Sequence, residues 1–197
     1  MWFVLAALAV VLAAAVGIYA GLKINDGPED KVVLVAADKA GERMKVPADQ
    51  DFADQLKVVL ARIAEQPEGS AGIAVSYATA AEQEDRRGLV VVVAAVEAPI
   101  GDPQTTVSQV TERFRIESEM LRDVVTVSPG SLGGAIRCGW IDGGDHDGGD
   151  FDTWQTPVCV WADTHTVGVV IFAPRHITAA QAKSEVLIIR AAVEQRV

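Results

Sequence analysis

Hydrophobic and polar residues divide this chain into three stretches of different character. Residues 1–22 are almost wholly apolar and carry no charge, and residues 23–31 form a short polar stretch with a Gly-Pro pair. From residue 32 onward, short apolar runs alternate with segments whose apolar residues recur every three or four positions. The pattern predicts a membrane segment at 1–22, a linker at 23–31 and one folded domain at 32–197.

Helical spacing of apolar residues recurs three times in the domain. It predicts helices at 51–66, 102–121 and from 178 to the C-terminus. Asp102 and Pro103 suit the start of the second helix, because Asp accepts from free amides and Pro fits the first turn. Thr178 and Gln181 have the spacing of a capping box, which marks the start of the third.

Short apolar runs predict about seven strands. They lie at 32–37, 71–79, 88–96, 124–127, 133–140, 157–162 and 166–173. The charged segment AAEQEDRR between the second and third runs is expected to be a turn that joins them as a hairpin. Strands linked mainly by hairpins, with about three helices, predict an α+β fold with a mostly antiparallel sheet.

The N-terminal apolar segment is long enough to span a bilayer. At about 1.5 Å per residue, a helix over residues 1–22 would cross a hydrocarbon core of about 30 Å. No basic residue precedes Trp2, and a cut after Ala20 would place Ile18 at the position where a signal peptidase needs a small residue. We therefore expect an uncleaved single-pass anchor in the cell membrane, although cleavage stays open.

Charge gives mixed signals about orientation. Lys23 and Lys31 follow the apolar segment and weakly favour a cytoplasmic domain. The formal net charge of −10 fits neither nucleic acid nor an anionic inner leaflet, so no nucleic-acid partner is expected. This charge and two cysteines placed as a plausible pair favour an extracytoplasmic domain.

Cys138 and Cys159 are the two cysteines, and they fall on strands expected to be neighbours. A disulfide between them would close the intervening loop at its base, and closing a loop of that size is worth about 3 kcal/mol. Two reduced, buried thiols are the alternative. A zinc site lacks two further ligands at a suitable spacing, and a CxxC redox motif is absent.

The segment between these strands, DGGDHDGGDFD, is rich in acid and glycine. Closely spaced carboxylates on a flexible loop can bind calcium, although the register matches neither an EF-hand nor a nonapeptide repeat. The alternative is a solvated hairpin tip that needs no metal. The candidate ligands are Asp142, Asp145, Asp147, Asp150 and Asp152.

Other residues of the same region could bind a ligand or support catalysis. Trp140, Trp154 and His146 form a candidate binding surface. His165 or His176 with a nearby carboxylate could serve a small hydrolase, but no GxSxG nucleophile motif occurs. No catalytic residue is therefore assigned.

The stretches PGSLGGAIRCG and CVWADTHTVGVV resemble a pattern found in uncharacterised single-pass membrane proteins of actinobacteria. The resemblance covers Pro129–Gly168 and implies a paired Cys138 and Cys159 in an outward-facing domain. It implies no activity. The expected role is that of a non-catalytic binding or accessory protein, whose partner is an envelope protein or a small ligand. A cell-envelope hydrolase and a calcium-dependent adhesion or sensor module are the alternatives.

Overall fold

A computed structural model describes seven stretches of the chain. They are residues 32–47, 50–66, 70–84, 91–116, 119–143, 154–172 and 177–197. Contacts divide the chain into two units, Met1–Lys31 and Val32–Val197. The predicted membrane segment and linker therefore lie outside the described residues. Within the described stretches, no helix is both long enough and apolar enough to cross a membrane.

An eight-stranded sheet forms the centre of the second unit. In spatial order its strands are β2 (Lys39–Ala40), β3 (Arg43–Val46), β4 (Gly72–Ala78), β5 (Val91–Glu97), β11 (Thr166–Phe172), β10 (Trp154–Ala162), β9 (Ala135–Gly143) and β8 (Arg122–Val127). Every pairing is antiparallel. Two meanders, β2–β5 and β8–β11, meet where β5 pairs with β11. The predicted α+β fold with a mostly antiparallel sheet is confirmed.

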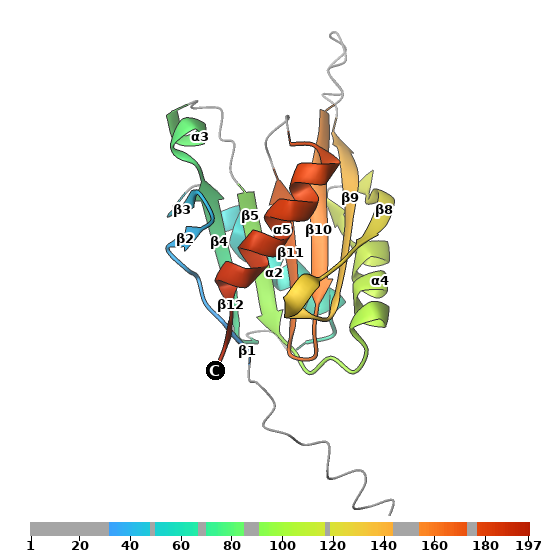
Figure 1. Ribbon diagram of the computed structural model, residues 1–197. Helices are drawn as coiled ribbons and strands as arrows, with labels where there is room; N and C mark the ends of the chain where they lie inside the picture. Colours follow the sequence, from blue (N-terminus) through green and yellow to red (C-terminus); the bar gives the residue numbers. More distant parts are fainter. Residues whose placement is uncertain are drawn as a thin grey trace, which may run out of the picture. The chain divides into compact units, whose positions relative to one another are not determined.

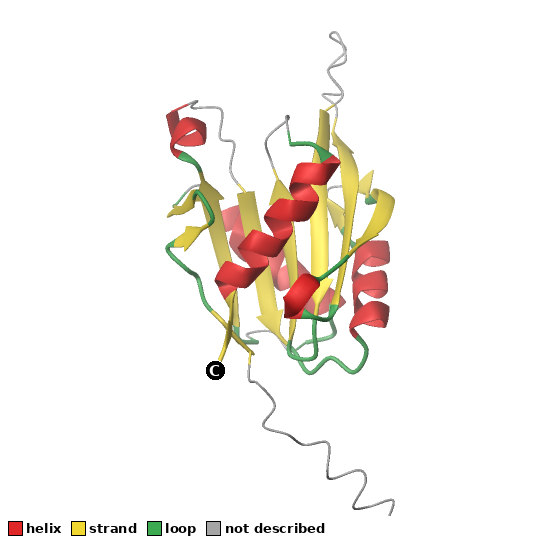
Figure 2. Cartoon of the chain, viewed as in Figure 1, coloured by secondary structure: helices red, strands yellow, loops and turns green. Residues whose placement is uncertain are grey.

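Helices cover both faces of this sheet. α2 (Gln50–Ile63) and α4 (Pro103–Arg113) pack on one face, and α5 (Ala179–Val193) crosses the other, as Figures 1 and 2 show. Successive strand residues point to opposite faces. Val91 and Val93 of β5 therefore join the cluster under α5, whereas Val92 and Ala94 join the cluster under α2 and α4. This double burial explains why β5 is apolar at every position but the last.

Two small sheets lie beside the large one. β1 (Val32–Leu34) pairs with β12 (Glu194–Arg196), and β6 (Arg115–Ile116) pairs with β7 (Glu119–Met120). A short 3₁₀ helix covers Gly130–Leu132. The expectation that the last helix continues to the C-terminus is wrong, because α5 ends at Val193 and the chain turns into β12.

The charged segment after β4 contains a helical turn that the sequence analysis missed. α3 (Ala80–Glu84) makes four α-helices in the described part of the chain, where about three were expected. The backbone N–H of Glu82 donates to the Thr79 hydroxyl at 3.2 Å, and the Thr79 N–H donates to the Glu82 carboxylate at 2.7 Å. This capping box stabilises the first turn, so the chain turns through a helix.

α4 begins where the sequence predicts but ends early. The Asp102 carboxylate caps its start by accepting from the backbone N–H groups of Gln104 and Thr105, both at 3.2 Å. The helix stops just before Phe114, which is fully buried, and the β6–β7 hairpin follows. Leu121 is buried in the same cluster, which it reaches from beyond the hairpin. Because Leu121 continues the helical spacing of the apolar residues in α4, the sequence predicted a longer helix.

Candidate functional site

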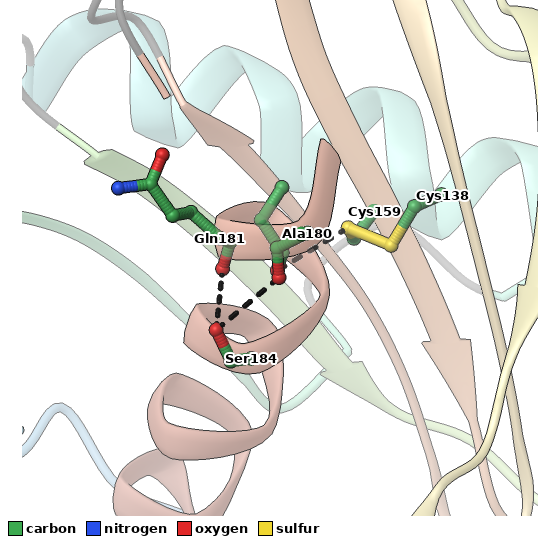
Figure 3. The surroundings of a disulfide bond; sticks show 6 residues. Cys138, Cys159, Ala180, Gln181 and Ser184 are labelled. Atoms are coloured by element: carbon green, nitrogen blue, oxygen red, sulfur yellow. Dashed lines mark hydrogen bonds between the residues drawn. A yellow bond between two sulfur atoms is a disulfide. The ribbon is translucent and has the colours of Figure 1, made fainter. Parts of the chain in front are cut away.

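The predicted disulfide between Cys138 and Cys159 is present. The two residues lie directly opposite each other on β9 and β10, with Cα atoms 4.0 Å apart. Both are buried under the first turns of α5 (Figure 3). The Cys159 sulfur lies 4.0 Å from the Ala182 carbonyl oxygen. Because a disulfide sulfur carries no hydrogen, this is a packing contact that fixes the helix against the hairpin.

The sequence predicts that the disulfide closes the acidic loop at its base. The structure places the disulfide further from the loop. β9 continues to Gly143 and β10 starts at Trp154, so the strand ladder runs five residue pairs beyond the disulfide and includes the first two residues of the acidic segment. The strand ladder itself therefore holds the ends of the loop together. The disulfide instead crosslinks the middle of two long strands beneath α5.

A buried ionic cluster lies on the same face of the sheet, around Arg190 of α5. Its guanidinium is fully buried and donates to Glu194 at 2.7 Å, to the Gly133 carbonyl at 2.8 Å and to Asp163 at 3.3 Å. We call Arg190, Glu194, Asp163, Thr166 and Trp161 the Arg190 cluster. All five residues are buried, so the charges are satisfied by each other and not by water.

The two carboxylates of the Arg190 cluster have different surroundings. Glu194 accepts from the Trp161 indole N–H and contacts the Thr166 hydroxyl. Asp163 accepts from the backbone N–H groups of His165 and Thr166, at 2.7 and 2.8 Å. Burial raises the pKa of Glu194 above its ordinary value, although the Arg190 charge opposes the rise.

The Thr166 hydroxyl lies between the two carboxylates of the Arg190 cluster. The Thr166 hydroxyl lies within hydrogen-bond distance of Asp163 and of Glu194, but it has one hydrogen and can donate to only one of them. The hydroxyl therefore bridges the two carboxylates, and Arg190 supplies the positive charge opposite both.

Glycines of the two quoted motifs allow the backbone to approach this cluster closely. Gly134 has a φ of +75°, and a Cβ there would lie 2.2 Å from the Ala162 carbonyl oxygen. A Cβ on Gly168 would lie 2.1 Å from the ring of Trp161. The motifs PGSLGG and CVWADTHTVG are therefore explained by the packing of this region.

The candidate metal ligands are only partly described. Asp142 belongs to β9, where its backbone is opposite Gln155. The other four, Asp145, Asp147, Asp150 and Asp152, lie outside the described residues. Among the residues that the structure describes, no group of three or more His, Cys, Asp and Glu side chains could hold a metal ion. The calcium hypothesis therefore stays a prediction.

The candidate binding surface is also incomplete. Trp140 lies half-buried on β9 and lines a small hollow with Pro157 and Lys183. Trp154 begins β10, and His146 lies outside the described residues, as does the candidate catalytic residue His176. Because His146 lies outside the described residues, the candidate surface of Trp140, Trp154 and His146 stays a prediction.

His165, the other candidate catalytic residue, occupies the tight turn between β10 and β11. Its ring Nδ1 lies 2.8 Å from the Thr164 hydroxyl, and its backbone N–H donates to Asp163. The Asp163 carboxylate closes this turn and also accepts from Arg190. The acid nearest in sequence to His165 thus has a structural role in the Arg190 cluster.

Arg190 and Glu194 were missed by the sequence analysis. The signal was present, since Arg190 lies between Val186 and Val193 at helical spacing within an apolar stripe. A charge on the buried face of a helix needs a buried partner. An i,i+4 Arg–Glu pair is usually an exposed surface pair, which is why it drew no attention.

An open hollow lies elsewhere, along the flank of α2. It measures about 720 Å³, within the range of small-molecule sites. Its lining is mixed and includes Lys57, Val58, Ala61, Arg62, Glu65, Gln66, Ser70 and Val96. Glu65 pairs with Arg113 at 3.5 Å, whereas Lys57 and Arg62 make no ion pair with any described residue.

The fold and these sites define a disulfide-containing α+β domain with helices on both faces of an antiparallel sheet. No protein-family model, curated protein or solved structure matches the chain.

Proposed function

We propose that this chain is a membrane-anchored, extracytoplasmic binding or accessory protein that does no chemistry on its ligand. The observation that carries the binding role is the open hollow beside α2. It has the size of a ligand site, an aliphatic floor and two basic side chains at its rim. The conspicuous residues of the cysteine-containing segment support the same view, because those described are engaged in packing and internal hydrogen bonds.

The proposed location is supported by two features. The apolar segment 1–22 is suited to anchor the chain in a membrane. The disulfide is buried under α5, and disulfides persist in compartments outside the reducing cytoplasm. Neither feature depends on which ligand the domain binds.

Location can be tested with an Asp54→Cys variant, which places one thiol on the exposed side of α2. In intact cells we expect this thiol to react with a membrane-impermeant maleimide, while Cys138 and Cys159 react only after reduction. Reaction of the new thiol only after lysis would place the domain in the cytoplasm and contradict the proposal.

The binding role can be tested in the same cells with a photoreactive amino acid. Val58 borders the hollow, and Ile188 on the outer side of α5 is a matched control because the two are 47% and 45% exposed. We expect irradiation to give a discrete mass shift of the purified chain for the Val58 probe and none for the Ile188 probe. Equal behaviour of the two probes would count against a binding site beside α2.

A further inference from the structure

The hollow carries two basic side chains, although the protein as a whole has a negative net charge. The chain has a formal net charge of −10, yet the rim of the hollow carries Lys57 and Arg62 without an ionic partner among the described residues. Glu65, the acid among the described residues of the lining, is already paired with Arg113. The local charge is therefore positive and available to an incoming anion.

Between these cations the surface is aliphatic. Val58 lies exposed on this flank of α2, and the buried side chains of Ala61 and Val96 lie behind it. Val58 is 47% exposed, which is high for a large aliphatic side chain in a domain that buries most of its valines. An apolar ligand group that covered this floor would remove aliphatic surface from water, with a gain of about 25 cal/mol per Å².

We propose that the hollow beside α2 binds an amphiphilic anion, with its apolar body on Val58 and the exposed edge of Ala61 and its acidic head at Lys57 and Arg62. This inference rests on the proposed binding role and specifies its ligand. A fatty acid or the acyl and head groups of an anionic lipid have this chemistry.

Other ligand classes fit the same surface less well. A cationic ligand would meet Lys57 and Arg62, and the carboxylate of Glu65 would have to leave Arg113 to receive it. A small inorganic anion would leave the aliphatic floor exposed. A neutral hydrocarbon would cover the floor but would gain nothing from the two cations.

The test uses the full-length chain in nanodiscs of zwitterionic lipid and follows the binding of dodecanoate by its effect on the spectrum of an environment-sensitive fluorophore attached at Asp54→Cys. Dodecanol, dodecylamine and acetate serve as probes that lack the charge, invert it or lack the apolar body. We expect saturable binding of dodecanoate and binding at least about tenfold weaker for each of the other three.

A charge-matched pair of variants separates a specific effect from a general one. Lys57→Gln with Arg62→Gln should weaken dodecanoate binding about tenfold, because the head group loses its charge-assisted hydrogen bonds. Lys39→Gln with Lys45→Gln removes the same charge from exposed positions on β2 and β3 and should leave the affinity unchanged.

The source of the ligand is addressed by a second set of nanodiscs that contain phosphatidylglycerol. If the anionic lipid of the bilayer occupies the hollow, it should compete with dodecanoate in the parent protein and less in the Lys57 and Arg62 variant. If only the free acid reaches the hollow, the affinity for dodecanoate should be the same in both nanodiscs. Both results support an amphiphilic anion.

Two results would overturn the inference. If dodecanoate and dodecanol bound equally well, and the loss of Lys57 and Arg62 changed neither affinity, the hollow would not recognise an anionic head group. A binding site beside α2 would still be supported. No saturable binding of any amphiphile would exclude the ligand class altogether. Neither result would alter the crosslinking comparison of Val58 with Ile188, which tests the binding role separately.

Discussion

The two faces of the sheet differ in how they use chemically conspicuous residues. Under α5 lie both cysteines, a buried tryptophan and the charged residues of the Arg190 cluster, all removed from solvent. On the other face, the flank of α2 combines ordinary lysine, arginine, valine and alanine residues into an open hollow. The conspicuous residues that the structure describes on the α5 face are thus part of the architecture, whereas the open surface beside α2 arises from common residues.

Arg190→Met should have the largest effect on stability. It would leave the carboxylates of Glu194 and Asp163 buried without their cation, at a cost of about 3–5 kcal/mol in the free energy of unfolding. Denaturant unfolding of the full-length chain in detergent, followed by tryptophan fluorescence, measures this change.

Arg113→Met is the matched control for that substitution, because Arg113 also forms an ion pair but is exposed. We expect it to cost at most about 1 kcal/mol. Adding Glu194→Gln to Arg190→Met should restore part of the loss, since one stranded charge is removed. Equal effects of the two arginine substitutions would show that the Arg190 cluster does not support the fold.

Removing the disulfide should have the next largest effect. Cys138→Ala with Cys159→Ala frees a loop with a sequence separation of 21 and should lower the free energy of unfolding by about 3 kcal/mol. The same measurement on the parent protein with and without reductant gives an independent value. A loss well below 1 kcal/mol would mean that the strand ladder alone constrains this hairpin.

Much of the face under α5 could be predicted from the sequence, but the buried Arg190 could not. Opposed strands at 133–140 and 157–162 were enough to predict the disulfide, because two cysteines fell on neighbouring strands. The early end of α4 and the strand β12 could not be predicted from spacing. Leu121 and Glu194 reach their buried positions through tertiary contacts, to which local periodicity is blind.

Two capping signals in the sequence mark helix starts that the structure confirms. The start of α4 at Asp102 and the capping box of Thr178 with Gln181 are both present. The same signature at Thr79 and Glu82 was overlooked, since the surrounding charges favoured a turn. The hollow beside α2 had no sequence signal, because it depends on how one flank of a helix lies against the end of β5.

The pH dependence of stability should distinguish Glu194 from an ordinary paired acid. Its pKa is raised in the folded state, so between its ordinary value of 4.5 and the raised value the folded chain binds more protons than the unfolded chain. Glu194 therefore contributes stability at low pH that is lost as pH rises through this window. Glu194→Gln should remove that decline in denaturant titrations that start at about pH 4 and rise through the raised pKa.

Glu82 supplies a control of opposite sign. Burial would raise its pKa, but hydrogen bonds from Arg43 and the Thr79 amide outweigh burial and lower it. Glu82 therefore stabilises the fold above the ordinary carboxyl pKa, and this stabilisation is lost as pH falls through the lowered pKa. Glu82→Gln should remove the corresponding increase in the free energy of unfolding with rising pH. If both variants changed the pH profile in the same direction, the contrast between the two acids would be wrong.

The flank of α2 should respond least of all. Lys57→Gln with Arg62→Gln is expected to change the free energy of unfolding by less than about 0.5 kcal/mol, because neither side chain has an ionic partner among the described residues. Side chains without a stabilising role are free to contact a ligand. A loss above 1 kcal/mol would show instead that these cations support the fold, and the two faces would then differ in exposure but not in their use of charge.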